Sequence, residues 1–396
     1  MPATKQLNAV MPTYARFPIT LVKGKGSYVW DDKGNKYLDF TSGIATCNLG
    51  HVPDAVKTAV DKQLQELWHC SNLYEIPSQQ KLAAKLVEHS FGDQVFFCNS
   101  GAEANEGAIK LARRYAQKMK KNDRFEVVTF KQSFHGRTLA TLTATGQEKI
   151  QDGFNPLPSG FRYLPYNDLQ ALDELVKKDT CAVLLELVQG EGGVIAADKE
   201  WLEKLSQLCK ENDILLMIDE VQTGIGRTGT LFAYEQFGIT PDVMTLAKGL
   251  GSGLPIGALI AKSHVAAAFE AGTHGSTFGG NPIVTSAGLA TLDYIFSKDV
   301  LTSASELAHY LTSKLQNLQA KYPQVIQGVR GLGLLQGLVI NGEAKGIIAK
   351  AREMQVLILP AGPNVVRILP PLTATVEEVD MLIQVLGEIL SEGVDL

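Results

Sequence analysis

The chain has little of several features that would each identify a class of protein. Its 396 residues carry 37 Lys and Arg against 42 Asp and Glu, and this slight acidic excess argues against partners such as nucleic acid or an anionic membrane surface. No apolar run approaches the roughly 20 residues of a membrane-spanning helix, and the N-terminus lacks the charged-then-apolar pattern of a secretory signal. We therefore expect a cytoplasmic protein.

Cysteine is also scarce. The five cysteines are odd in number, scattered and without a CxxC pair: Cys47, Cys70, Cys98, Cys181 and Cys209. This pattern argues against a disulfide framework and against a metal site. It predicts reduced thiols, some of them in the core.

What the chain does have is enough apolar material for a large core, at 45% hydrophobic residues. From Val95 onward, short apolar runs alternate with helical patterns. Strands are expected at 95–98, 126–130, 181–185, 214–218 and 243–246. Such βα alternation predicts an α/β fold with a mostly parallel central sheet wrapped by helices.

The two ends of the chain have a different texture. Residues 27–40 read as two strands joined by a turn, and a long helical stretch runs from about 286 toward Lys321. We expect a small α+β domain built from both ends, 1–49 and 286–396, and a large domain at 50–285.

One strand that ends in a carboxylate is the central feature of the sequence. Ile214 to Ile218 are apolar, and Asp219 and Glu220 follow directly. A buried parallel strand delivers its carboxyl end to the crevice where open α/β sheets bind ligands. Burying Asp219 there costs free energy unless a cation or a donor meets it.

The glycines after this strand match GxGxxG at Gly224, Gly226 and Gly229. A dinucleotide site needs these glycines straight after the strand with a helix opening there. Here Asp219 to Thr223 intervene, so a nicotinamide-dependent dehydrogenase is only a remote alternative. A glycine-rich turn without a ligand is the better interpretation.

Other polar residues follow the remaining strands. Ser100 to Glu103 opens a helix, where free N–H groups bind phosphate well, although the same residues also form an ordinary capping box. Phe134 could stack on a flat ring, and Arg137 could grip a carboxylate. A core phenylalanine and a solvated arginine are the simpler interpretations of each alone. Glu186 and Glu191 follow the next strand.

Lys248 ends the strand after that of Asp219, where partial desolvation would make its amine nucleophilic. Ser276 and Thr277 lie among glycines, which suits a phosphate, and Arg367 is a cation in an apolar stretch that could equally be a structural ion pair. A lysine, an aspartate for a protonated ring nitrogen, a phosphate cup and a stacking ring together match the needs of pyridoxal 5′-phosphate.

Six motifs carry a family resemblance: NSGAEAN, FHGRT, QGEGG, IDEVQTGIGRTG, LAKG and GSTFGGNP. In this order and spacing the whole chain resembles the class III (subgroup II) pyridoxal-phosphate aminotransferases. WHCSNLY, FHGRT and HGSTFGGNP are most similar to the acetylornithine aminotransferases of arginine biosynthesis. The resemblance implies a fold type I transferase and a homodimer with its sites at the interface.

The same resemblance implies a role for each matching residue. Lys248 would bind the cofactor and shuttle the substrate proton, and Asp219 would pair with the pyridine nitrogen. The implied cofactor site comprises Ser100, Gly101, Ala102, Phe134, Asp219, Val221, Gln222, Lys248 and, from the second subunit, Thr277. The implied substrate residues are Arg137, Ser276 and Arg367, with Glu191 as the counter-ion that masks Arg367 in one half-reaction.

The implied reaction converts N2-acetylornithine and 2-oxoglutarate into N-acetylglutamate 5-semialdehyde and glutamate. Ornithine aminotransferases carry a tyrosine near Ile44, and an apolar residue there disfavours ornithine more than GABA. GABA and succinylornithine therefore remain alternative donors. A catalytically inactive binding module is disfavoured because Lys248, Asp219, Arg137 and Arg367 are all retained.

Overall fold

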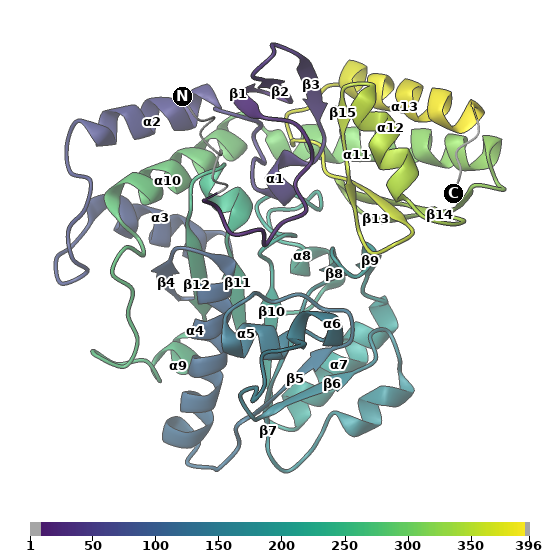
Figure 1. Ribbon diagram of the computed structural model, residues 1–396. Helices are drawn as coiled ribbons and strands as arrows, with labels where there is room; N and C mark the ends of the chain where they lie inside the picture. The colour runs from purple at the N-terminus through teal and green to yellow at the C-terminus, as the bar shows by residue number, and fades with distance from the viewer. Residues whose placement is uncertain (1–8, 393–396) are drawn as a thin grey trace, which may run out of the picture.

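The computed structural model describes residues 9–392. A seven-stranded sheet forms the centre of the molecule (Figure 1). In spatial order its strands are β4 (Gln94–Cys98), β12 (Gly257–Ala261), β11 (Val243–Leu246), β10 (Leu215–Asp219), β7 (Thr180–Leu185), β5 (Glu126–Phe130) and β6 (Phe161–Leu164). Strand β12 runs antiparallel to both neighbours, and the remaining pairs of adjacent strands are parallel. The predicted mostly parallel sheet is confirmed.

The central strands are buried on both faces, which explains their continuous apolar sequences. Side chains alternate between the faces. Leu216 and Ile218 belong to one core cluster, whereas Leu215 and Met217 belong to the other. The sheet therefore separates two hydrophobic cores, one on each face.

Helices cover both faces of the sheet. The first core includes side chains of α3 (Pro77–Glu88), α7 (Lys199–Glu211) and α10 (Pro282–Ser297), and α10 also packs on α2 (Asp54–Leu64). The second includes α4 (Gly101–Arg114) and α9 (Ser263–Ala266). Shorter helices lie in the connections: α5 (Leu139–Ala144), α6 (Glu148–Gln151) and α8 (Tyr234–Phe237).

Both chain ends combine in the smaller α+β part, where the purple N-terminal strands lie beside the yellow C-terminal elements (Figure 1). One sheet has the order β1-β2-β3-β15, so the two ends share it directly. Its strands are β1 (Leu21–Lys25), β2 (Tyr28–Asp31), β3 (Lys36–Asp39) and β15 (Val356–Leu357). The predicted hairpin at 27–40 is confirmed as β2 and β3.

A second sheet is built from the C-terminal segment, in the order β13-β14-β17-β16. Its strands are β13 (Ile326–Leu332), β14 (Leu335–Ile340), β17 (Val365–Ile368) and β16 (Leu359–Pro360). The helices here are α11 (Val300–Lys321), α12 (Lys345–Glu353) and α13 (Val376–Ser391). A third, two-stranded sheet pairs β8 (Val188–Gln189) with β9 (Ile195–Ala196).

Three features differ from the sequence analysis or were absent from it. The helical stretch expected from 286 to Lys321 is two helices, because Asp299 adopts a left-handed φ of 50° that ends one and starts the other. Strands β6 and β12 were not predicted: β6 is a half-exposed edge strand containing Arg162, and β12 follows a glycine-rich loop. The domain boundary predicted at residue 285 falls inside α10.

Candidate active site

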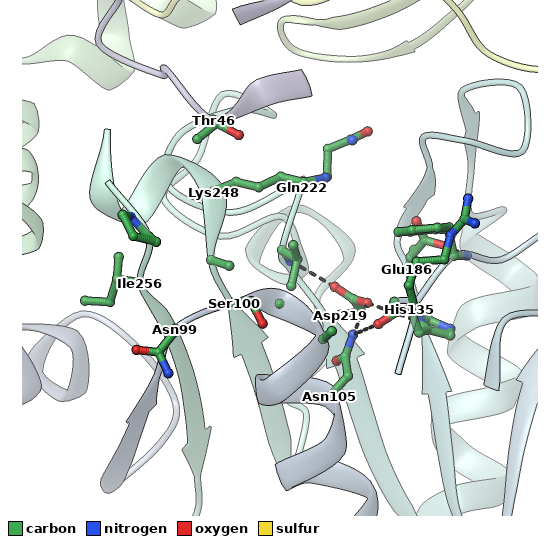
Figure 2. A pocket seen from close by; sticks show the side chains of 18 of the residues that line it. Thr46, Asn99, Ser100, Asn105, His135, Glu186, Asp219, Gln222, Lys248 and Ile256 are labelled. Atoms are coloured by element: carbon green, nitrogen blue, oxygen red, sulfur yellow. Dashed lines mark hydrogen bonds and ion pairs between the residues drawn. The ribbon is translucent and has the colours of Figure 1, made fainter. Parts of the chain in front are cut away.

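A cavity of about 480 Å³ opens at the carboxyl ends of the central strands (Figure 2). That volume is in the range that accommodates a small cofactor with its substrate. Residues that line it include Thr46, Asn99, Ser100, Gly101, Ala102, Asn105, Phe134, His135, Arg137, Glu186, Glu191, Asp219, Val221, Gln222 and Lys248. Most of the residues predicted for the cofactor therefore meet in one cavity.

Asp219 is held at the floor of this cavity by three donors. Its Oδ2 accepts hydrogen bonds from Asn105 Nδ2 and from His135 Nδ1, both at 2.8 Å, and its Oδ1 accepts one from Val221 N at 3.0 Å. Because an ionised carboxylate only accepts, His135 carries its proton on Nδ1. A carboxylate can accept about four hydrogen bonds, so one position remains for a donor from a ligand.

Asn105 is itself fixed from the neighbouring strand. Thr245 Oγ1 on β11 donates to Asn105 Oδ1 at 2.7 Å, and Asn105 Nδ2 also donates to the His135 carbonyl at 2.8 Å. The register Asp219↔Thr245 places the two strand ends side by side. All four side chains are at least 96% buried, so a buried hydrogen-bond network fixes the position of Asp219.

Lys248 directly follows β11 and begins a short 3₁₀ turn, Lys248–Gly251. Its side chain is partly buried and extends along the cavity (Figure 2). Burial lowers the pKa of this amine, and the nearby Glu191 carboxylate acts in the opposite sense. A desolvated lysine is more readily neutral, which is the form that attacks a carbonyl carbon.

A helix start forms one wall of the cavity. Ser100 is the N-cap of α4, and its Oγ accepts from Glu103 N at 3.2 Å. The capping interpretation is therefore correct for the hydroxyl, while the first N–H groups of the helix remain available to an anion. A Cβ added at Gly101 would lie 2.8 Å from Val221 Cγ1, so only glycine fits there without displacing its neighbours.

The walls beside Asp219 carry the remaining predicted cofactor residues. Phe134, Val221 and Gln222 line the cavity, and the Arg137 guanidinium lies 5.5 Å from the centre of the Phe134 ring. Gln222 Oε1 is buried without a hydrogen-bond partner among the described residues. Such an acceptor fits a ligand that presents a donor.

Two carboxylates adjoin the cavity on the other side. Glu186 is buried, and its Oε1 accepts from Phe134 N at 2.8 Å. Burial, reinforced by the Asp219 carboxylate, raises the pKa of Glu186 well above its usual range. Glu191 pairs with Arg367 at 2.5 Å, so the structure brings together two residues that are 176 positions apart. Arg367 is 2% exposed.

Ser276 and Thr277 lie outside this cavity. They border a second hollow of about 720 Å³ with His69, Leu73 and His274, and Asn99 Nδ2 donates to Ser276 Oγ at 3.1 Å. Thr277 therefore lies away from the Lys248 cavity of its own chain, and its contact with the phosphate of a second subunit stays a prediction.

Thr46 reaches the cavity from the small domain through a strained turn. The four residues before it, Ser42 to Ala45, all have left-handed φ values of 45–62°. Each costs roughly 1–2 kcal/mol where a side chain is present. Ser42 Oγ donates to Leu369 O at 2.6 Å and Ala45 is buried, which holds the turn in place. Ile44 faces a neighbouring hollow instead.

Sequence reasoning missed three members of the network around Asp219. The sequence analysis assigned no role to Asn105, His135 or Thr245. The available signal was positional: Thr245 lies on the strand that precedes Lys248, and Asn105 lies one turn into the helix capped by Ser100.

The glycines at 224–229 lie in a turn and do not form a dinucleotide site. Residues 220–233 form turns, and helix α8 begins only at Tyr234, so no helix opens at Gly224. Instead the cavity offers a partly buried amine, an anchored carboxylate, a helix start and an aromatic ring. This fold and site define an enzyme of the fold type I class that uses pyridoxal phosphate.

The chain belongs to the class III aminotransferase family, whose model, "Aminotransferase class-III", matches residues 9–390. The acetylornithine aminotransferase of Oceanobacillus iheyensis is 60% identical over 98% of this chain and 97% of its own length. The N-acetylornithine aminotransferase of Stenotrophomonas maltophilia K279a superposes with a TM-score of 0.83 at 36% identity, covering 96% of this chain and 97% of its own.

An ornithine aminotransferase from Toxoplasma gondii superposes with a TM-score of 0.91 at 31% identity, covering 96% of this chain and 91% of its own. That structure is described as showing partial occupancy of pyridoxal phosphate at the active site. The chain is therefore an aminotransferase that uses pyridoxal phosphate.

Proposed function

We propose that this protein transfers the δ-amino group of N2-acetylornithine to 2-oxoglutarate, a step of arginine biosynthesis. The ion pair of Glu191 with Arg367 beside the Lys248 cavity carries the proposal, because the enzyme must accept two donors of different charge. The acetylornithine aminotransferases of high identity support the choice of donor.

Different residues of the cavity would bind different parts of the cofactor. Lys248 would hold it covalently, Asp219 would receive its ring nitrogen, and the start of α4 would receive its phosphate. When bound, pyridoxal phosphate supplies an electron sink for the carbanion left at the substrate carbon. Asn105 and His135 hold the Asp219 carboxylate in place, so that it would meet a protonated ring nitrogen.

Lys248 would also move the substrate proton. Its lowered pKa favours the neutral amine that can accept a proton from the substrate carbon and return it. Phe134 and Val221 would hold the ring between them, and Gln222 would accept a hydrogen bond through its free Oε1.

Glu191 and Arg367 would act as a switch between the two half-reactions. With the pair closed, the wall next to Lys248 presents no free cation, which suits the uncharged chain around the δ-amino group of acetylornithine. With the pair opened, Arg367 would bind the α-carboxylate of glutamate with its bidentate fork. Arg137 would hold acetylornithine, and Ser276, which lies outside this cavity in its own chain, would contribute only from a second copy.

A second copy of the chain would complete each site. Large apolar side chains are exposed near the second hollow: Trp68 is 63% exposed, Leu73 88%, Tyr74 70% and Phe278 60%. A patch of this kind marks a protein interface. We propose a cytoplasmic homodimer in which Thr277 of the partner subunit joins the phosphate site. In the described residues, no helix has the length and apolar character needed to span a membrane.

The test follows the visible absorbance of the purified protein while amino donors are added without an oxo acid. N2-acetylornithine should discharge the band of the lysine-bound cofactor far more efficiently than GABA or ornithine. If only GABA or ornithine discharges it, the chemistry stands and the proposed donor is wrong. Lys248→Ala should remove both the band and the transamination, and a Lys248→Ala protein with wild-type rates contradicts the mechanism.

A further inference from the structure

The glycine-rich loop at 224–229 lies between the large and the small domain. A Cβ added at Gly226 would lie 2.7 Å from Leu372 Cδ1, and one at Gly333 would lie 2.3 Å from the Thr228 carbonyl carbon. Both glycines have left-handed φ values, of 86° and 59°. The glycines therefore allow this loop to contact the C-terminal part of the chain at a distance that side chains would prevent.

The Arg227 side chain is fully buried, and its hydrogen bonds within residues 9–392 go to segments from the two chain ends. Its Nη2 donates to Asn48 Oδ1 at 2.7 Å, and its Nη1 donates to Leu334 O at 3.1 Å and to Pro370 O. These acceptors are carbonyl and amide oxygens, and no carboxylate among the described residues pairs with this guanidinium.

A buried cation that is not paired with a carboxylate destabilises a fold, because several kcal/mol of hydration free energy are lost per ion. An apolar residue of similar volume often stabilises such a site as well or better. What the guanidinium adds is direction, since its rigid fork binds acceptors from three separate segments at once. Its placement therefore indicates a role in positioning.

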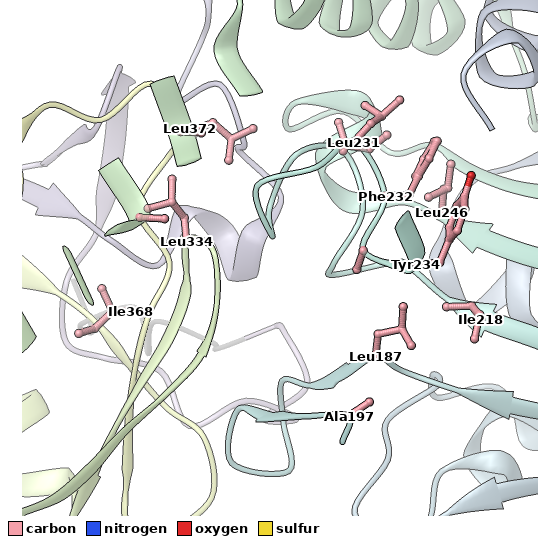
Figure 3. Close-up of a cluster of buried hydrophobic side chains, with 14 of the residues drawn as sticks. Leu187, Ala197, Ile218, Leu231, Phe232, Tyr234, Leu246, Leu334, Ile368 and Leu372 are labelled. Carbon is pink, nitrogen blue, oxygen red and sulfur yellow. The ribbon is translucent and has the colours of Figure 1, made fainter. Parts of the chain in front are cut away.

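The contacts around Arg227 run in both directions between the loop and the chain ends, although the Arg227 Nε has no hydrogen-bond partner in the described structure. Asn48 Nδ2 donates to Ile225 O at 2.8 Å, Leu334 N donates to Arg227 O at 3.0 Å, and Leu372 N donates to Asn48 O at 2.7 Å. Figure 3 shows Leu334 and Leu372 on the C-terminal side of the same junction and Leu231 on the loop side. The junction combines directional bonds with an apolar core.

This network is connected to both ends of the substrate site. Pro370 lies three residues after Arg367 on the same segment, and Arg367 reaches Glu191 at 2.5 Å. On the other side, a Cβ added at Gly249 would lie 2.2 Å from Asn48 Nδ2, so Asn48 packs against the residue that follows Lys248.

We propose that Arg227 is a positioning residue that sets the distance between Lys248 and Arg367, and with it the fit of the dicarboxylic substrate. The proposal rests on the proposed role of Arg367 in binding the α-carboxylate. A displacement of about 1 Å at such a site can lower the rate about a hundredfold. The acetylornithine half-reaction, in which Arg367 stays paired, should depend much less on Arg227.

The experiment compares Arg227→Met and Arg227→Lys with Arg162→Met in the cofactor-loaded enzyme. Arg162 is the matched control, because it donates to Glu126, to Thr180 and to the Leu175 carbonyl, all within the large domain. Three quantities are measured: the Kd of the unreactive dicarboxylate glutarate from the cofactor spectrum, the KM and kcat for 2-oxoglutarate, and amide hydrogen exchange in β14 and β17.

Arg227→Met should raise the glutarate Kd and the KM for 2-oxoglutarate about tenfold, on the order of a partial loss of alignment. Exchange in β14 and β17 should become faster, while the saturating rate of the acetylornithine half-reaction stays within about twofold. Arg227→Lys, which keeps the charge but loses the fork, should fall between Arg227→Met and the wild type. Arg162→Met should lower Tm and leave the glutarate Kd unchanged.

A folded Arg227→Met protein with the wild-type glutarate Kd and wild-type exchange overturns the proposal. If Arg227→Met does not fold, the same readouts on Arg227→Lys decide. If the wild type itself binds no glutarate, the role of Arg367 fails separately. In that case amide hydrogen exchange in β14 and β17 of Arg227→Met tests the role of Arg227 separately. Unchanged exchange refutes the link between the domains, and faster exchange supports it.

Discussion

Two buried threonines on central strands should respond in opposite ways to the same substitution. Thr129 on β5 and Thr245 on β11 are both 0% exposed. Thr245 Oγ1 donates to Asn105 Oδ1 at 2.7 Å, whereas Thr129 Oγ1 has no hydrogen-bond partner in the described structure. Valine has the same shape as threonine but lacks the hydroxyl.

Thr245→Val removes a buried hydrogen bond and leaves Asn105 Oδ1 without its donor. A lost bond is worth about 1 kcal/mol and an unsatisfied buried acceptor about 1–3 kcal/mol, so we expect a loss of about 2 kcal/mol in the free energy of unfolding. Thr129→Val removes only a hydroxyl that already lacks a partner, and it should be neutral or stabilise by up to about 1 kcal/mol. The two variants should therefore differ by about 2–3 kcal/mol.

Denaturant unfolding of the cofactor-free protein measures this difference, with far-UV circular dichroism as the signal. Cofactor titration provides a second readout, because loosening Asn105 also loosens Asp219: Thr245→Val should bind pyridoxal phosphate more weakly, and Thr129→Val should not. Equal destabilisation by both substitutions would falsify the assignment of the network. So would a Thr245→Val protein with unchanged stability and unchanged cofactor affinity.

Three further substitutions test other parts of the site. Burial raises the pKa of Glu220 to about 7, above its ordinary 4.5. Between these two pKa values the folded state binds more protons than the unfolded state, so the free energy of unfolding should fall as pH rises through that window. Relative to Glu220→Gln, the loss should reach up to about 3 kcal/mol at neutral pH. Tm measured against pH for both proteins checks this prediction, and parallel Tm curves contradict it. Glu191→Gln removes the charged partner of buried Arg367, so glutarate should bind more tightly, with a lower Kd. The acetylornithine half-reaction, followed by stopped-flow absorbance, should slow about tenfold. If neither value changes, the proposed switch between Glu191 and Arg367 is wrong. Gly101→Ala places a Cβ 2.8 Å from Val221 Cγ1 and should weaken cofactor binding about tenfold in a titration of the cofactor-free protein. An unchanged Kd for the cofactor would show that the neighbouring residues move to accommodate the methyl group.

Short-range signals in the sequence were sufficient for the elements of the large domain. Fully buried parallel strands must be apolar on both faces, so β7, β10 and β11 were identifiable as runs of four to six residues. Since the carboxyl ends of parallel strands meet at one edge of a sheet, Asp219 and Lys248 were predictably close. The capping box of Thr375 and Glu378 at the start of α13 is a local signal of the same kind.

The sequence by itself therefore determined the fold class and many of the residues that line the cavity, because periodicity, capping and strand ends are local properties of the chain. Tertiary structure alone decided which side chains support them. Asn105 reaches Asp219 across 114 residues and Thr245 across 140, and Arg227 reaches Pro370 across 143. Such hydrogen bonds depend on distances that only the packed fold fixes, and no spacing along the chain encodes them.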